Sequence, residues 1–174
     1  MDWETPVDAW YVWVGVTIAS LAIAGVVLSL PTQPPPDAAR AANTVDRVAG
    51  STQVAAATAD HRAEEIRLGT SRLSMRNNGG TAHATIAFGP VTPVVAVDDA
   101  VAREALRLLL DGTPRSAVLD RAAFETLTES DLRKAADSAR ASRRDDSPAW
   151  HQAGDRLRVR SVSLAGEVVV LVGA

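Results

Sequence analysis

The 174-residue sequence is balanced in charge over most of its length and has no cysteine, and these two features exclude several classes of protein. Asp2, Glu4 and Asp8 are the only charged residues before Asp37, and the chain from Asp37 onward carries 18 acidic and 18 basic side chains, so it offers no basic face for nucleic acid. The absence of cysteine excludes disulfides, thiolate metal sites and cysteine nucleophiles.

A long uncharged segment follows the acidic N-terminal tail, residues 1–8. Residues 9–30 are apolar apart from Thr17, Ser20 and Ser29. As an α-helix these 22 residues rise about 33 Å, which is enough to cross a hydrocarbon core of about 30 Å. The sequence therefore predicts one transmembrane helix over residues 9–30 and, with it, a lipid bilayer as partner.

Two other interpretations of residues 9–30 are a buried core helix and a cleavable secretory signal. A core helix of so small a protein would present a polar face to water, and this segment has none. A secretory signal has a basic start and an apolar core of roughly 7–15 residues. Here the start is acidic and the apolar segment is longer, so we expect the helix to be retained as an anchor.

The two ends of the predicted helix differ in composition. Trp10, Tyr11 and Trp13 lie at the first end, where aromatic side chains anchor transmembrane helices at the membrane interface. Pro31 and the prolines of residues 34–36 follow the second end, and such a stretch cannot continue a helix. We expect a proline-rich linker there.

Small residues recur along the predicted helix at a spacing that lets transmembrane helices approach closely. They are Gly15, Ala19, Ala22 and Gly25. The spacing is compatible with helix packing between subunits, and also with the ordinary glycine and alanine content of a membrane helix.

The charges near the helix do not decide on which side of the membrane the C-terminal part lies. Arg40 and Arg47 follow the helix and no Lys or Arg precedes it, so the positive-inside rule favours a cytoplasmic C-terminal part. Asp37 and Asp46 offset these two arginines, and a margin of two against none is small.

Residues 31–50 are predicted to form the linker and a short helix, which is either a stalk or the first helix of the following domain. Asp37 can cap this helix and Gly50 can end it. This helix has one weak apolar stripe, which consists of Ala38, Ala41, Ala42, Val45 and Val48.

Residues 51–174 are predicted to form a small α+β domain with an antiparallel sheet. Apolar residues alternate between about Arg62 and Phe88, and the sequence Asn-Asn-Gly-Gly at 77–80 predicts a hairpin turn, because Asn and Gly tolerate positive φ. The strand pattern returns at 157–162 and 167–172, and the latter strand is apolar on both faces, which predicts a central position in the sheet.

Three helical segments are predicted between these strands. The first begins at Asp98-Asp99 and ends near Asp111, with an apolar side made of Val101, Ala105, Leu108 and Leu109. The second covers residues 115–126. The third covers residues 128–144 and begins with a Thr-Glu-Ser-Asp sequence that resembles a capping box. Its apolar side is thin, so we expect this helix at the surface.

Residue types that carry catalysis or bind metals occur here without the partners that such sites need. His61 and Glu64 have a spacing that on a helix could offer two metal ligands, but no second ligand motif accompanies them. His83 is expected on an exposed strand face, and His151 at the edge of the domain beside Trp150. The motifs of phosphate-binding loops and of serine-hydrolase elbows are absent. The sequence therefore predicts no catalytic residue, metal or cofactor, and no enzyme.

One concentration of basic residues lies in the predicted helix over residues 128–144. It consists of Arg133, Lys134, Arg140, Arg143 and Arg144. These side chains could dock on an acidic partner or on anionic lipid headgroups. Alternatively, the last of them complement the dipole at the C-terminal end of the helix.

The order of a short tail, a membrane helix, a stalk and a small C-terminal sheet domain resembles type IV pilin-like proteins, in particular uncharacterised haloarchaeal single-pass membrane proteins. The resemblance implies an archaeal cell-envelope subunit of a pilus- or secretion-type assembly, with other membrane or pilin-like subunits as partners and the domain outside the cytoplasm. A basic leader and a Glu inside the helix are typical of such proteins, whereas Glu4 and Asp8 both precede this helix. A membrane-tethered ligand-binding or sensor module is the alternative.

Overall fold

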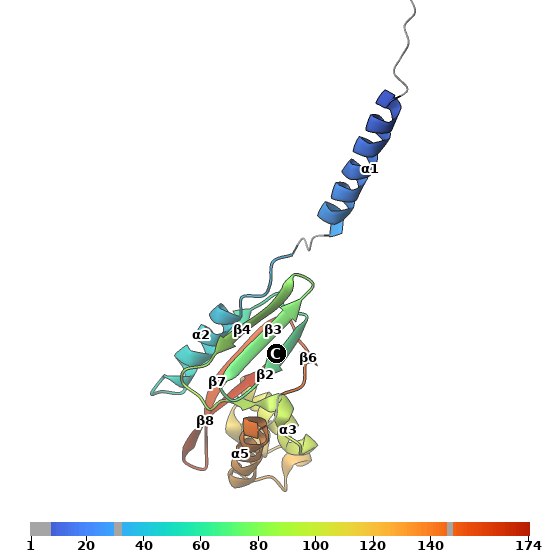
Figure 1. The fold of residues 1–174 in the computed structure, drawn as a ribbon. Coiled ribbons are helices and arrows are strands. Elements are labelled where there is room, and N and C mark those ends of the chain that lie inside the picture. The colour runs from blue at the N-terminus through green and yellow to red at the C-terminus, as the bar shows by residue number, and fades with distance from the viewer. Residues whose placement is uncertain (1–7, 30–32, 146–147) are drawn as a thin grey trace, which may run out of the picture. The chain divides into compact units, whose positions relative to one another are not determined.

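The computed structural model describes residues 8–29, 33–145 and 148–174, with side chains from Trp10 onward except those of Arg144 and Asp145. It contains an N-terminal helix and, separately, a compact domain of residues 35–174 (Figure 1). The domain combines helices with mostly antiparallel sheets, which confirms the predicted α+β class.

The N-terminal helix, α1, runs from Asp8 to Ser29. Residues Trp10–Ser29 have a mean hydropathy of 2.2 and are long and apolar enough to cross a membrane. None of these residues is buried. The structure therefore contains the long apolar helix that the sequence predicts at this position.

Two four-stranded sheets form the framework of the domain. The first has the order β1-β7-β8-β5 and the second has the order β4-β3-β2-β6. All pairs are antiparallel except the short pair of β5 with β8. The strands are β1 (Ala56–Asp60), β2 (Glu65–Leu68), β3 (Arg72–Asn77), β4 (Gly80–Thr85), β5 (Thr92–Pro93), β6 (His151–Gln152), β7 (Arg156–Leu164) and β8 (Glu167–Gly173).

The hairpin turn predicted at residues 77–80 is confirmed. Asn77 pairs with Gly80 at the end of β3 and β4, and Gly80 has a φ of 137°. Between β7 and β8 the turn residues Ala165 and Gly166 have φ values of 49° and 83°. β8 lies between β7 and β5, which confirms its predicted central position, and three of its seven residues are buried.

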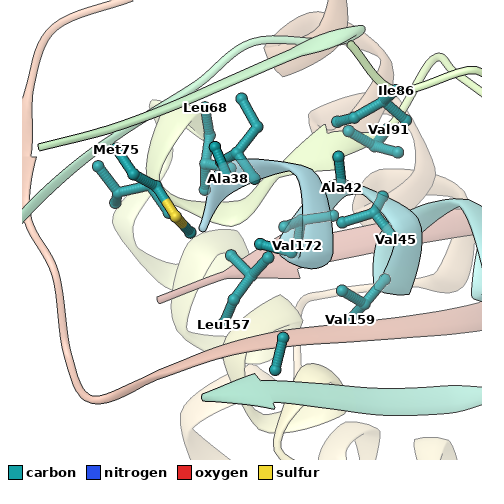
Figure 2. Packing of buried hydrophobic residues seen from close by; sticks show 14 of the residues in the cluster. Ala38, Ala42, Val45, Leu68, Met75, Ile86, Val91, Leu157, Val159 and Val172 are labelled. Atoms are coloured by element: carbon teal, nitrogen blue, oxygen red, sulfur yellow. The ribbon is translucent and has the colours of Figure 1, made fainter. Parts of the chain in front are cut away.

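Helix α2 (Ala38–Ala49) is part of the domain core. Its N-cap Asp37 accepts a hydrogen bond from the amide of Arg40 at 2.9 Å. Every residue of its predicted apolar stripe is at most 2% exposed, and Figure 2 shows stripe residues of α2 pointing toward Leu157, Val159 and Val172 of the first sheet. Since the compact domain begins at residue 35, it includes this helix, which the sequence analysis left as either a stalk or a domain helix.

A second hydrophobic core lies on the other face of β8. Val169 and Leu171 of β8 belong to this core, whereas Val172 belongs to the first. The remaining helical elements supply most of its other members: η1 (Val94–Ala96), α3 (Ala100–Leu110), α4 (Arg115–Leu119), η2 (Ala122–Phe124) and α5 (Glu129–Asp145). The helices α3 and α5 lie together, apart from α2 (Figure 1).

The predicted apolar side of α3 is only partly right. Ala105 and Leu109 are buried, but Val101 is 45% exposed, and Leu106 and Leu110 are buried in its place. Residues 106–110 include four leucines, so apolar spacing alone did not show which of them face the core.

Helix α5 is more deeply packed than predicted. Leu132, Ala136 and Ala139 are at most 1% exposed, because two alanines on one side let the helix approach its neighbours closely. The predicted helix over 115–126 is divided into α4 and η2, and strand β1 was not predicted.

Candidate functional site

The exposed apolar surface of α1 is the first candidate site. The predicted interface residues Trp10, Tyr11 and Trp13 are 59, 72 and 73% exposed. The hydroxyls of Thr17 and Ser29 donate to backbone carbonyl groups within the helix, each at 2.8 Å. A helix that satisfies its own polar groups and exposes apolar side chains has the properties of a membrane-spanning segment.

The small residues of α1 are free of neighbours in the described structure. A Cβ atom added to Gly15 or Gly25 would meet nothing within 4 Å. Ala19 and Ala22 are exposed too. These four residues are therefore available for contact with another helix, and the predicted helix packing stays a prediction.

A cavity of about 280 Å³ in the domain is the second candidate site. It lies where α3 meets β2, β6 and the C-terminal end of β8. Its apolar lining is provided by Ile66, Leu68, Val94 and Leu110, each at most 8% exposed. The residues come from elements far apart in the sequence, so sequence reasoning did not find this cavity.

The charged lining of the cavity is mainly basic. It contains four arginines and two acidic residues, namely Arg103 and Arg107 of α3, Arg156 and Arg158 of β7, Glu104 and Asp111. None of these arginines was singled out from the sequence, because nothing in their spacing shows that α3 and β7 meet.

The arginines of the cavity differ in whether their guanidinium groups already have hydrogen-bond or ion-pair partners. Arg158 donates to Asp111 at 2.7 Å, and Arg156 lies 3.0 Å from Asp60. Arg103 donates to the carbonyl group of Val97 at 3.1 Å. The side chain of Arg107 has no hydrogen-bond or ion-pair partner in residues 8–29, 33–145 and 148–174, so its guanidinium is available to a bound molecule.

His151 lies in β6 opposite Ile66 and lines the same cavity. Its Nε2 atom is buried and has no hydrogen-bond partner among the described residues. Buried polar atoms in proteins are usually hydrogen-bonded, so an unpaired nitrogen at a cavity needs an explanation. From the sequence, His151 is expected at the domain edge, and no role is predicted for it.

Trp150, which precedes β6, contacts two arginines on the outer face of the second sheet. The guanidinium carbon of Arg67 lies 4.6 Å from the centre of the indole ring, and that of Arg76 lies 4.5 Å from it. Arg76 also donates to Glu65, and this hydrogen bond holds the pKa of Glu65 below its ordinary value. The two cation–π contacts attach the segment before β6 to the sheet.

The other two histidines, His61 and His83, form no site with each other. His61 and Glu64 lie in the loop between β1 and β2, so the two ligands on one face of a helix do not exist. His83 is exposed as predicted, and its Nδ1 lies 2.8 Å from the Ser74 hydroxyl. Among the described residues no group of three His, Asp or Glu side chains could hold a metal ion.

The predicted basic cluster of α5 is largely neutralised. Arg133 lies 2.9 Å from Glu167, and Arg140 lies 3.3 Å from Asp137. Lys134 lies 3.8 Å from Asp131, Arg143 is half-buried, and the side chain of Arg144 is outside the described residues. These pairs leave less free charge for docking than the sequence indicated.

Comparison with known proteins gives one family. A model described as a family of unknown function, DUF7283, matches residues 4–162, which include α1 and most of the domain. Comparisons with curated proteins and with solved structures gave no match.

Proposed function

Because the chain belongs to the DUF7283 family, whose function is unknown, we infer its role from its own residues and propose a single-pass membrane protein of the cell envelope. In this proposal α1 anchors the chain in the lipid bilayer and the domain acts by binding, without catalysis. The domain lies on the outer side of the membrane.

The observation that carries the anchor proposal is the exposure of α1. Eight Val, Leu and Ile side chains of this helix are more than half exposed. Burying each of them is worth about 2 kcal/mol, so together they favour an apolar environment by on the order of 15 kcal/mol. That sum equals or exceeds the whole stability of a typical domain, which is about 5–15 kcal/mol.

Charged substitutions in the middle of α1 test the anchor. Leu21→Arg with Ile23→Arg places two charges where each costs about 2.5–3.5 kcal/mol in a bilayer. We expect the wild-type chain in the membrane fraction after a carbonate wash, and the double variant displaced from it. The same substitutions at Val54 and Val168, which are 65 and 64% exposed in the domain, serve as the matched control and keep the chain in the membrane.

Recovery of the wild-type chain as a monodisperse soluble monomer without detergent would overturn the anchor proposal. The side of the membrane is tested separately by adding protease to intact cells. Digestion of the domain supports the outer location, whereas a protected domain supports a tethered module that acts from the cytoplasmic side.

A pilin-like subunit is the finer form of this proposal. It is supported by the four small residues of α1 and the open space around Gly15 and Gly25. Because the chain has no cysteine, Ala19→Cys and Ala24→Cys each introduce a single thiol, on different sides of the helix. Packing through the small residues predicts disulfide-linked dimers in native membranes for Ala19→Cys and far fewer for Ala24→Cys. Equal yields would argue against it.

A further inference from the structure

We propose that the cavity bounded by α3, β2, β6 and the end of β8 binds a small organic anion that carries an apolar group, with Arg107 as its main charged contact. This ligand site goes beyond membrane anchoring and does not depend on it. The domain would bind the same ligand on either side of a membrane.

The lining of the cavity selects for a ligand with both apolar and charged parts. Ile66, Leu68, Val94 and Leu110 line one part of it, and they can enclose a hydrocarbon or an aromatic ring. Ligand sites in proteins typically combine such apolar walls with a few placed polar groups.

The charges of the cavity select for an anion. Arg158 is already paired with Asp111, and Arg156 is paired with Asp60, so these two arginines are compensated. Of the remaining charged side chains, Arg103 and Arg107 are basic and only Glu104 is acidic. None of these three has an ion-pair partner in the part of the chain that the structure describes.

Arg107 is the side chain best placed for the charged contact. Arg103 uses one of its nitrogens to bind the Val97 carbonyl group, whereas every donor of Arg107 is open. A guanidinium binds a carboxylate through two parallel hydrogen bonds, which gives both strength and orientation. His151 is a further polar residue of the cavity lining.

The size of the cavity limits the ligand to a small molecule. Its volume of about 280 Å³ lies near the lower end of known ligand sites, which are roughly 300–1,000 Å³. A carboxylate on a single ring is of this size. Benzoate is therefore a suitable probe, benzylamine tests the sign of the charge, and inorganic phosphate tests the need for an apolar part.

The test is a titration of the full chain in nanodiscs of zwitterionic lipid, with methyl NMR signals of Ile66, Leu68, Val94 and Leu110 as the readout. We expect saturable shifts with benzoate and none with benzylamine or phosphate. Arg107→Gln is expected to weaken benzoate binding about tenfold, because one charge-assisted bidentate contact is lost.

Arg121→Gln is the matched control, because Arg121 is exposed, lies outside the cavity and has no ion-pair partner among the described residues. It is expected to leave benzoate binding unchanged. Absence of saturable shifts with benzoate, equal shifts with benzylamine, binding of phosphate alone, or unchanged affinity in Arg107→Gln would each overturn the proposal. Since the readout is local to the cavity, none of these results would bear on the membrane anchor.

Discussion

Asp99 fixes the start of α3 through one hydrogen bond. Its Oδ1 accepts from the amide of Ala102 at 2.6 Å, and its backbone is extended, as an N-cap residue requires. The adjacent Asp98 is exposed and is not the cap. Two neighbouring residues of the same type therefore differ in their contribution to stability.

Asp99→Ala is expected to lower the free energy of unfolding by about 1 kcal/mol, because an amide at the start of α3 loses its partner. Asp98→Ala is the control and is expected to change it by less than about 0.5 kcal/mol. Chemical denaturation of the full chain in detergent micelles measures both. Equal effects of the two substitutions would contradict the capping role.

His61 is a half-buried imidazole in the loop after β1. Its Nδ1 accepts a hydrogen bond from the amide of Ala63 at 3.3 Å, and its Nε2 is buried without a partner among the described residues. Burial lowers the pKa of His61, against the opposing charges of Asp155 and Asp60. The folded protein therefore holds this imidazole in its neutral form at a lower pH than the unfolded chain does.

The lowered pKa predicts a pH dependence of stability. As the pH falls below the ordinary histidine value of 6.5, the unfolded chain takes up a proton before the folded protein does, so stability decreases toward the lower folded pKa. Above 6.5 the contribution of His61 is constant. We expect His61→Gln to reduce the slope of the free energy of unfolding against pH between pH 7 and pH 5. The exposed His83 is the control, and His83→Gln is expected to leave that slope unchanged. An unchanged slope in His61→Gln would rule out this assignment.

Cap residues were predictable from the sequence, whereas buried loop residues were not. Asp37 and the Thr128–Asp131 pair form the predicted bonds, and Asp99 is the cap at the predicted start of α3, since a cap depends only on residues within one turn. The burial of His61 depends on how a loop folds back beside Asp155, which lies far along the chain.

At the level of elements, α5 shows the limit of judging a helix by its number of large apolar residues. Among the described side chains of α5, Leu132 is the only large one that is buried, and Ala136 and Ala139 complete the stripe against the second core. Small side chains bury little area themselves, but they allow close packing around the leucine.

Leu132→Ala is expected to destabilise the domain by about 2–5 kcal/mol, because it leaves a cavity in a closely packed core. Lys134→Ala, on the exposed side of the same helix, is expected to have an effect below about 0.5 kcal/mol. Thermal unfolding of the full chain in micelles gives both values. A small loss for Leu132→Ala would mean that α5 lies loosely on the surface, as the sequence had indicated.

Strands with a clear apolar pattern were predicted and others were missed. β2, β3 and β7 show alternating apolar residues, β8 is a continuous apolar run, and the hairpin turns carry residues that accept positive φ. β1 has the sequence Ala-Ala-Thr-Ala-Asp, which contains no large apolar side chain. It becomes a strand because it pairs along β7, and a pairing of distant segments leaves no local pattern.

For the whole molecule, the position of α2 decides where the folded domain begins. Asp46 of α2 accepts hydrogen bonds from the amides of Ala87 and Phe88, at 2.8 and 2.9 Å, and the apolar stripe of the helix is buried in the first core. Through these contacts α2 is bonded to the segment after β4 and packs in the first core. The helix is therefore an integral part of the domain.

Two truncations test this boundary. A chain without residues 1–34 is expected to unfold cooperatively in the absence of detergent, because both cores stay complete. Removing residues 1–50 also removes Val45 and Val48, each worth about 1.5–3 kcal/mol, together with three buried alanines. That loss is comparable with the stability of a whole domain, so no cooperative transition is expected. A stable shorter chain would show that α2 is dispensable.

The sequence predicted the apolar helix but not the cavity, and the reason lies in chain distance. The apolar character of α1 is contained in one continuous segment. The cavity combines α3 with β2, β6, β7 and the end of β8, and a single sequence does not show which of these elements meet.

The contacts of Trp150 with Arg67 and Arg76 have a practical consequence for optical work on this protein. The chain has four tryptophans, and Trp3, Trp10 and Trp13 all precede residue 35. Without that segment, a single indole remains, and it is adjacent in sequence to His151, which lines the cavity. Its native emission can thus report the folding of the domain in a label-free recording.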